Sequence, residues 1–223
     1  MTGRIAPVLR GAAVFALLVA WAVLAHLGSA GESDANFGAA LGVAPLIVIV
    51  ALLLWRVRNP LWLVAGGLIM LAALVAAWPT LRANVPLLYL VQHVGTNLAL
   101  ATIFGRTLFG GGDALVTQFA RVVHGEISER KIRYTRGVTV AWTAFFIGIS
   151  LTSVLLFNLA SAHVWSVFAN LLSTPLLVVM FAGELLCRYT LLPPEERTGV
   201  VDSIRAYRLN MRRQQKTTLA DPS

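Results

Sequence analysis

The sequence has few charged residues and almost no cysteine. Only 13% of its 223 residues are charged, whereas a soluble globular domain is usually about one-quarter charged. So little charge does not coat a water-exposed surface, which excludes a soluble domain. Cys187 is the single cysteine, so no disulfide forms within the chain, and cysteine usage does not indicate a redox compartment.

Long apolar runs dominate the chain instead. Hydrophobic residues make up 57% of it, and its mean hydropathy is +0.75. The runs are about 20 residues long, which is the length that a helix needs to cross the hydrocarbon core of a bilayer. A strand of a membrane barrel would be about half as long and would alternate. We therefore predict an all-α, polytopic membrane helix bundle over residues 1–193, with six transmembrane helices at about 11–27, 38–55, 61–78, 85–105, 137–160 and 164–187.

The basic residues lie on one side of these predicted spans. With the N-terminus in the cytoplasm, only Arg82 of the 18 Lys and Arg residues falls on the outer side. The positive-inside rule therefore predicts that both termini are cytoplasmic. The net charge of +8 then belongs to the cytoplasmic membrane face, and we expect no nucleic-acid partner. Residues 194–223 are predicted to form a basic cytoplasmic tail that is partly disordered.

The first apolar run has a second interpretation. Arg4 and Arg10, the run itself and the small residues at 28–30 also match a cleaved signal peptide. The run of 17 residues at 11–27 is longer than the apolar region of a typical signal peptide, so we prefer a retained helix. Cleavage would leave five spans and an N-terminus outside the cytoplasm.

A glycine triplet, Gly110–Gly112, follows the fourth predicted span. A phosphate-binding loop would need a strand before it and a Lys followed by Ser or Thr after it, and this sequence has neither. The triplet is better read as a hinge that turns the chain from along the membrane normal to across it. Asp113 is then expected to cap the next helix, and Gly125 is expected to end it.

The segment after the hinge has one apolar face. Leu115, Phe119, Val122 and Val123 recur at helical spacing, which is typical of an amphipathic helix. Between spans 4 and 5, such a segment predicts a short helix lying in the membrane interface.

The fourth span carries the densest group of polar residues within the membrane. Tyr89, His93 and Asn97 share one helical face, with Gln92 on its flank. One interpretation is a polar pocket or a proton-responsive site centred on His93. The other is a set of hydrogen bonds between helices, which we favour because no acidic partner is predicted at mid-depth.

Basic residues near the cytoplasmic ends of spans 4 and 5 are candidates for binding an anion. Arginine recognises phosphate and carboxylate groups through paired hydrogen bonds, although charge that only orients the protein is the commoner explanation. Glu184 is the single acidic residue within a predicted span, and Arg188 lies four residues after it, a spacing that allows an ion pair. Arg106 or Arg136 are alternative partners for Glu184. The candidate ligand-binding residues are Arg106, Arg121, Arg133, Arg136 and Glu184.

Motifs for catalysis and metal binding are absent. No established motif of a hydrolase or metalloenzyme occurs, so an enzyme is the less favoured class. If the chain is an enzyme, Glu184 and His124 are the candidate catalytic residues. The four histidines are scattered along the sequence, and we expect neither a metal nor another cofactor.

Several short motifs in residues 85–193 resemble a known family. They are FGRTL, LVTQFAR, YTRGVTVAWTAFF and MFAGELLCRYTLLP. They are similar to a poorly characterised family of small bacterial inner-membrane proteins that accompany fatty-acid-synthase-like genes for aryl polyenes or xanthomonadins. The resemblance implies a membrane component that helps to make, transfer or export a lipid-like acyl product. The motif positions that it carries over are Arg106, Thr117, Arg121, Tyr134, Arg136, Thr139, Trp142, Asn170 and Glu184.

These observations leave three hypotheses for function. The first is an accessory protein of the bacterial inner membrane that binds an anionic headgroup or an acidic carrier protein at its cytoplasmic face. The second is a small transporter or flippase that uses the polar face of span 4. The third is an intramembrane acyl- or phospho-transferase. The partners considered are membrane lipids, an acyl carrier protein, pathway enzymes and a second copy of the chain.

The orientation yields a first prediction. A reporter of cytoplasmic location fused after residue 125 should be active, and a reporter of periplasmic location fused there should be silent, because the fourth connection carries many basic residues. Sequencing the N-terminus of the mature protein is the companion measurement, since an intact Met1 indicates a retained first span. A periplasmic signal at residue 125 would overturn the predicted orientation.

Overall fold

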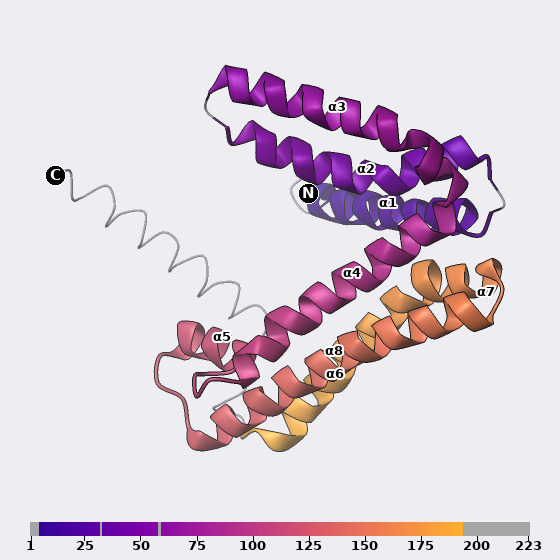
Figure 1. Cartoon of the computed structure of the whole chain (residues 1–223). Helices are drawn as coiled ribbons and strands as arrows, with labels where there is room; N and C mark the ends of the chain where they lie inside the picture. Colours follow the sequence, from indigo (N-terminus) through magenta and orange to yellow (C-terminus); the bar gives the residue numbers. More distant parts are fainter. Residues whose placement is uncertain (1–4, 32, 58, 194–223) are drawn as a thin grey trace. The chain divides into compact units, whose positions relative to one another are not determined.

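The computed structural model describes residues 5–31, 33–57 and 59–193. Within these ranges the chain consists of helices joined by turns, without strands, which confirms the all-α class (Figure 1). The predicted tail at 194–223 lies outside the described residues. The elements are α1 (Ile5–Ser29), α2 (Ala35–Trp55), α3 (Pro60–Ala83), α4 (Val85–Gly105), η2 (Arg106–Leu108), α5 (Leu115–His124), α6 (Glu129–Leu159), α7 (Ala162–Ser166), η3 (Val167–Leu172) and α8 (Ser173–Leu191).

Six helical stretches in the described ranges are long and apolar enough to cross a membrane. The prediction of six such helices is therefore confirmed, and they indicate a multi-pass membrane protein. The stretches are Gly11–Ser29, Ala35–Trp55, Pro60–Ala83, Val85–Leu108, Glu129–Leu159 and Ala162–Leu191.

Several of these helices extend beyond the apolar runs that predicted them, and α3 and α6 are two examples. α3 continues through Pro79 to Ala83, because a proline removes one backbone hydrogen bond without ending every helix. α6 begins at Glu129, although its apolar run begins only at about residue 137. The additional turns are rich in charged residues, so hydropathy did not reveal them even though Glu, Arg and Lys are good helix formers.

Contacts divide the chain into two compact units. Within the described ranges, unit 1 comprises the residues up to 96 together with 149–176, and unit 2 comprises residues 97–148 together with those from 177 onward. Helices α4, α6 and α8 each contribute residues to both units.

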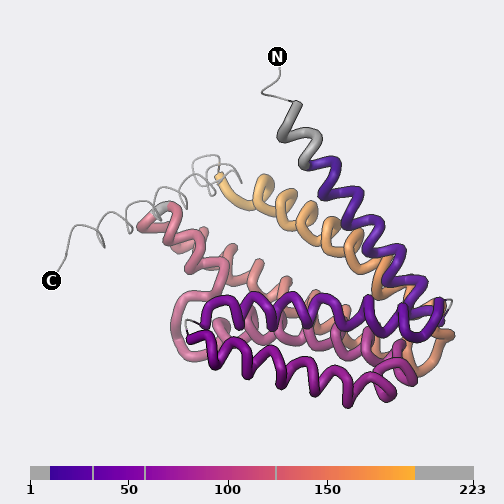
Figure 2. Tube along the Cα trace, turned by 90° about the horizontal axis from the view of Figure 1, so that it is seen from above, coloured from indigo at the N-terminus to yellow at the C-terminus, as the bar shows by residue number. Residues whose placement is uncertain are grey.

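Unit 1 is built on the first three helices. α1 packs on α2, and α2 packs on α3, which lies beside it in both views (Figures 1 and 2). α1 also contacts α7 and η3. Trp165 and Tyr89 are the large side chains of the buried core, and the Trp165 ring lies 5.3 Å from the ring of Phe157, centroid to centroid.

Glycines allow the helices of unit 1 to approach closely. A Cβ atom added at Gly38 would lie 3.1 Å from the carbonyl oxygen of Gly28 and 3.1 Å from Cγ1 of Val85. One added at Gly42 would lie 2.9 Å from atoms of Leu88 and Tyr89. Small residues at helix interfaces permit this kind of close packing in membranes.

The sixth span contains an irregular segment. η3 is a π-helix at Val167–Leu172, between α7 and α8. Pro175 follows it, within the first turn of α8, and cannot donate a helical hydrogen bond because it has no N–H. The backbone therefore departs from α-helical geometry before the proline, and π-helical turns of this kind occur frequently at functional sites.

Unit 2 has an aromatic core around Trp142. The Trp142 and Phe181 rings lie 4.6 Å apart in an edge-to-face arrangement, which joins α6 to α8. Phe104 of α4 contacts both Trp142 and Phe146, at 6.1 and 5.7 Å between ring centroids. Edge-to-face aromatic pairs add stabilisation beyond the burial of their area, so this cluster fixes the three helices together.

The hinge before α5 uses the conformational freedom of glycine. Gly110 and Gly111 have φ angles of 91° and 75°, values that are uncommon for residues with a side chain. At the other end, Gly125 has a φ of 73°, and its N–H donates to the carbonyl oxygen of Arg121 at 2.8 Å. The predicted end of the helix at Gly125 is therefore confirmed.

The predicted cap at the start of α5 is wrong. The N-cap residue is Ala114, which makes no capping hydrogen bond through its side chain, while Asp113 forms an ion pair with Arg121. The N–H of Leu115 donates to Oγ1 of Thr107 at 2.9 Å, and the N–H of Val116 donates to Oγ1 of Thr139 at 3.3 Å. Neighbouring elements therefore provide the acceptors that a local capping residue normally provides.

The close packing at Gly38 generates a second prediction. Gly38→Ala should destabilise the protein by about 1–3 kcal/mol relative to Gly67→Ala, because overpacking a tight contact costs about that much. Gly67 is the matched control, since an added Cβ meets no heavy atom within 4 Å. Denaturation in a series of increasing SDS content measures both variants. Equal midpoints for the two variants would contradict the tight contact.

Candidate functional site

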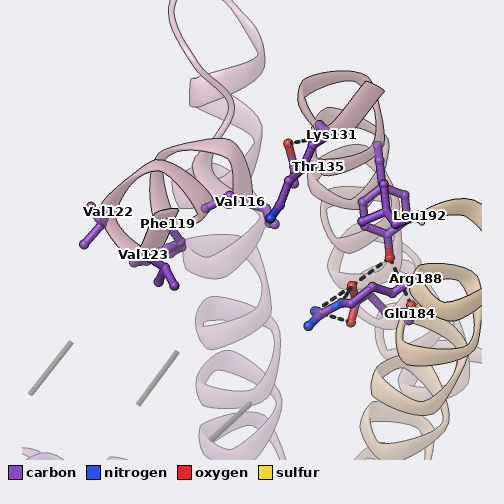
Figure 3. A pocket seen from close by; sticks show the side chains of 11 residues that line it. Val116, Phe119, Val122, Val123, Lys131, Thr135, Glu184, Arg188 and Leu192 are labelled. Carbon is purple, nitrogen blue, oxygen red and sulfur yellow. Dashed lines mark hydrogen bonds and ion pairs between the residues drawn. The ribbon is translucent and has the colours of Figure 1, made fainter. Parts of the chain in front are cut away.

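A cavity of about 260 Å³ lies in unit 2 between α5, α6 and α8. Figure 3 shows α5 with its apolar side chains on one side, and Glu184 and Arg188 of α8 on another. The cavity thus combines an apolar wall with charged groups. Its lining residues are Val116, Phe119, Ala120, Val122, Val123, Lys131, Tyr134, Thr135, Glu184, Arg188 and Leu192.

Glu184, Arg188 and Tyr134 form the polar centre of this cavity. Arg188 Nη2 lies 2.8 Å from each carboxylate oxygen of Glu184, and Arg188 Nε donates to Oε1 at 3.1 Å. The Tyr134 hydroxyl donates to the same Oε1 at 2.9 Å. The predicted pairing of Glu184 with Arg188 is therefore confirmed. The Glu184 side chain is only 9% exposed. Its contact with the cation of Arg188 offsets the cost of removing the carboxylate from water.

Threonines hold α5 against α6 beside the cavity. The Thr135 hydroxyl donates to the carbonyl oxygen of Lys131 at 2.9 Å, so Thr117 supplies the proton in its 2.7 Å bond to Thr135. Thr117 and Thr135 are both buried, as is Lys131, which is 4% exposed. The apolar wall from α5 is thereby fixed next to the cation of Lys131.

A second, larger cavity lies in unit 2 along α6 and α8. It has a volume of about 560 Å³ and shares Tyr134 and Glu184 with the first cavity. We call it the α6–α8 groove. Its lining residues are Arg133, Tyr134, Gly137, Val138, Ala141, Val179, Met180, Gly183, Glu184, Cys187 and Leu191.

The structure brings two of the predicted ligand-binding residues to one cavity. Glu184 and Arg133 both line the α6–α8 groove, whereas Arg106, Arg121 and Arg136 line neither cavity. Arg136 Nη2 instead donates to the carbonyl oxygen of Leu108 at 2.9 Å, where it supports the turn before the glycine hinge.

The other candidate residues lie away from the two cavities or outside the described side chains. Arg106 is exposed, and Arg121 pairs with Asp113. The side chain of His124 lies outside the described part of the structure. The sequence analysis did not name Lys131, which also lines the first cavity. Its position one helical turn before Thr135 places both residues on the same face of α6.

The polar face predicted on α4 makes hydrogen bonds to other segments in unit 1. The Tyr89 hydroxyl donates to the carbonyl oxygen of Gly38 at 3.3 Å, and Gln92 Nε2 donates to that of Gly42 at 2.9 Å. His93 Nδ1 lies 3.1 Å from Oγ of Ser153, and Nε2 lies 3.0 Å from Oγ of Ser173. Asn97, the fourth candidate, belongs to unit 2.

The hydrogen-bond partners of neutral His93 determine which of its ring nitrogens carries the proton. The Ser173 hydroxyl donates to the carbonyl oxygen of Phe168 in the π-helix at 2.9 Å. Ser173 therefore accepts from Nε2–H of His93, which leaves Nδ1 to accept from the hydroxyl of Ser153. Ser153 in turn accepts from Nε1–H of Trp165 at 3.0 Å. Each residue in this series donates to the next one, from Trp165 through Ser153, His93 and Ser173 to the π-helix.

A second polar group in unit 1 joins α1 to the sixth span. The Ser29 hydroxyl donates to Oγ of Ser166 at 2.9 Å, and Asn170 Nδ2 donates to Oγ of Ser29 at 2.9 Å. His26 Nδ1 also bonds to Ser166, and the His26 and His163 rings lie 5.1 Å apart. Two histidines that are far apart in the sequence are therefore neighbours.

No cluster of metal-ligating side chains occurs in the ranges that the structure describes. The chain matches no protein-family model, and it matches no curated protein and no solved structure. Inferences about function therefore rest on the two cavities and on the polar groups of unit 1.

The ion pair in the cavity generates a third prediction. Arg188→Met should destabilise the protein, because it leaves Glu184 buried without its cation, and truncating one partner of a buried pair is costly. Glu184→Gln with Arg188→Met should recover part of that loss, with a coupling of about 0.5–3 kcal/mol in a double-mutant cycle. Thermal unfolding in detergent measures the four proteins. Strict additivity of the two substitutions would show that the pair contributes no coupling.

Proposed function

We propose that this chain is an accessory protein of the bacterial inner membrane that assists the synthesis, transfer or export of a lipid-like acyl product. It binds the anionic headgroup of an amphiphile at its cytoplasmic face. The observation that supports this proposal is the cavity in unit 2, which has an apolar wall on one side and charged groups on another.

The composition of the cavity favours an anionic amphiphile. Lys131 and Arg188 contribute two cationic side chains to the lining, beside the carboxylate of Glu184. Val116, Val123 and their neighbours on α5 provide the apolar contact that an acyl chain requires. A ligand with an acidic head and an apolar body satisfies both parts of the cavity.

The same cavity lies near the ends of the spans. Phe119 and Val122 of α5 are 62% and 52% exposed, and exposed aromatic and aliphatic side chains on a short helix suit the lipid interface. We propose that α5 lies in this interface on the cytoplasmic side, where the positive-inside rule places its connection. The resemblance of the motifs in residues 85–193 supports the proposed bacterial inner membrane.

A transporter is the second candidate, and one observation favours it. The hydrogen-bonded series through His93 ends on a π-helix, and polar residues within the membrane commonly mark a path for a substrate or a proton. The transferase alternative is weaker. Both oxygens of Glu184 already accept hydrogen bonds from Arg188, so this carboxylate is not a free base.

The proposal yields a fourth prediction. Ala120→Phe should fill the cavity and weaken binding of phosphatidylglycerol, because the side chain projects from its apolar wall. The wild-type protein should bind phosphatidylglycerol about fivefold more tightly than phosphatidylcholine, since a basic residue near an anionic headgroup contributes about 1 kcal/mol. Native mass spectrometry with each lipid measures both effects and also identifies amphiphiles that co-purify.

Ala99→Phe is the matched control, because Ala99 is exposed on α4 and lines neither cavity. It should bind both lipids as the wild-type protein does. Equal affinity of the wild-type protein for the two lipids would refute recognition of an anionic headgroup. Flux into vesicles that His93→Ala abolishes, with lipid binding retained, would favour the transporter instead.

A further inference from the structure

The α6–α8 groove has the form of a site for one acyl chain. We infer that it binds a single acyl chain that ends in a carboxylate, with the carboxylate at Arg133 and the chain lying along α6 and α8. This inference deepens the proposed function, on which it rests, by naming the class of acyl molecule.

The length of the groove matches one leaflet of a bilayer. Its wall on α6 extends from Arg133 to Ala141, and its wall on α8 extends from Val179 to Leu191. At 1.5 Å of rise per residue, these walls are about 12 Å and about 18 Å long. Half of the hydrocarbon core of a bilayer is about 15 Å thick, and one layer of acyl chains fills that thickness.

Small residues make the hollow. Gly137, Ala141 and Gly183 line the groove, and a Cβ atom added at either glycine would meet no heavy atom within 4 Å. Val138, Val179 and Met180 line the same groove, which is apolar apart from Arg133, Tyr134 and Glu184. The apolar part gives a chain of methylene groups close contact and offers no partner to a polar group.

Two charged residues line the groove, Arg133 at one end of its α6 wall and Glu184 within its α8 wall. The charged lining residues are Arg133 and Glu184, and the Glu184 carboxylate is already bound by Arg188 and Tyr134. Within the described ranges, Arg133 has no carboxylate at ion-pair distance. The groove therefore presents one uncompensated cation at the end of an apolar wall, which is the complement of a fatty-acid anion.

The two cavities meet at the hydrogen bond from Tyr134 to Glu184, since both residues line both spaces. An acyl chain in the groove thus brings its carboxylate next to the cavity that we assign to a headgroup. This adjacency suits a protein that passes an acyl product from one binding mode to another.

Cys187 provides a direct test, because it lines the groove, is exposed, and is the single cysteine of the chain. The rate at which N-ethylmaleimide alkylates it is measured in phosphatidylcholine nanodiscs, with palmitate, hexadecanol or butyrate added. Palmitate should slow alkylation at least tenfold, hexadecanol should slow it less, and butyrate should have no effect. Because phosphatidylcholine is present throughout, protection by palmitate reports a preference over the bilayer lipid.

Two pairs of variants locate the bound molecule. Gly137→Leu should fill the groove and remove protection by palmitate, while Gly148→Leu, on the same helix and also facing open space, should retain it. Arg133→Gln should make palmitate and hexadecanol equally protective, whereas Arg130→Gln, outside the groove, should keep the preference. Ala141→Leu repeats the filling test if Gly137→Leu does not fold.

The outcomes separate this inference from the proposed function. Equal protection by palmitate and hexadecanol in the wild-type protein, or protection unchanged by filling the groove, would overturn the inference. If the groove inference is overturned in this way and phosphatidylglycerol binding still depends on Ala120, the proposed function is supported and the groove assignment is wrong. If palmitate protects Cys187 but phosphatidylglycerol binding does not depend on Ala120, the acyl-chain assignment of the groove is supported and the headgroup assignment of the other cavity is wrong.

Discussion

The constraint on which this structure depends is that hydrocarbon offers no hydrogen-bond partners. Every polar side chain within a span must therefore find its partner inside the protein. Unit 1 meets this requirement with neutral groups, in the series of hydrogen bonds that passes through His93, Ser153 and Ser173. Unit 2 meets it with ions, in the contact of Glu184 with Arg188 and Tyr134. The difference in charge makes unit 2 the part of the molecule that suits an ionic ligand.

The position of Glu184 explains why two cavities share one boundary. Its carboxylate accepts from both neighbours and is held where the apolar wall of α5 meets the small residues along α6. A buried ion pair is weak evidence for stability, since an apolar replacement of similar volume is often as stable. At the junction of two hollows, the pair fits the proposal that this part of unit 2 binds a charged molecule.

Hydropathy and residue spacing predicted the helices well, because both reflect solvation along a single segment. The six apolar runs, the end of α5 at Gly125 and the pair of Glu184 with Arg188 all follow from local sequence. The start of α6 was missed because charged residues interrupt the apolar run without interrupting the helix.

The site itself was predictable only in part. Lys131 and the α6–α8 groove depend on which helices meet, and spacing along one helix does not contain that information. The same holds for His26 and His163, which are neighbours because α1 contacts α7. The cap of α5 was wrong for a related reason, since Thr107 and Thr139 provide acceptors from other elements and the adjacent Asp113 does not.

The N-terminal N–H groups of α5 are capped by residues of other elements, and this has a consequence for biosynthesis. α5 has ten residues, and so short a helix is marginal in water on its own. Thr139, which accepts from the N–H of Val116, and Thr135, which bonds to Thr117, both follow α5 in the sequence and are therefore translated after it. Helix α5 therefore acquires its contacts with α6 only once the following segment has been synthesised and packed against it. The cavity that it walls is complete only later, because Glu184 and Arg188 of α8 also line it.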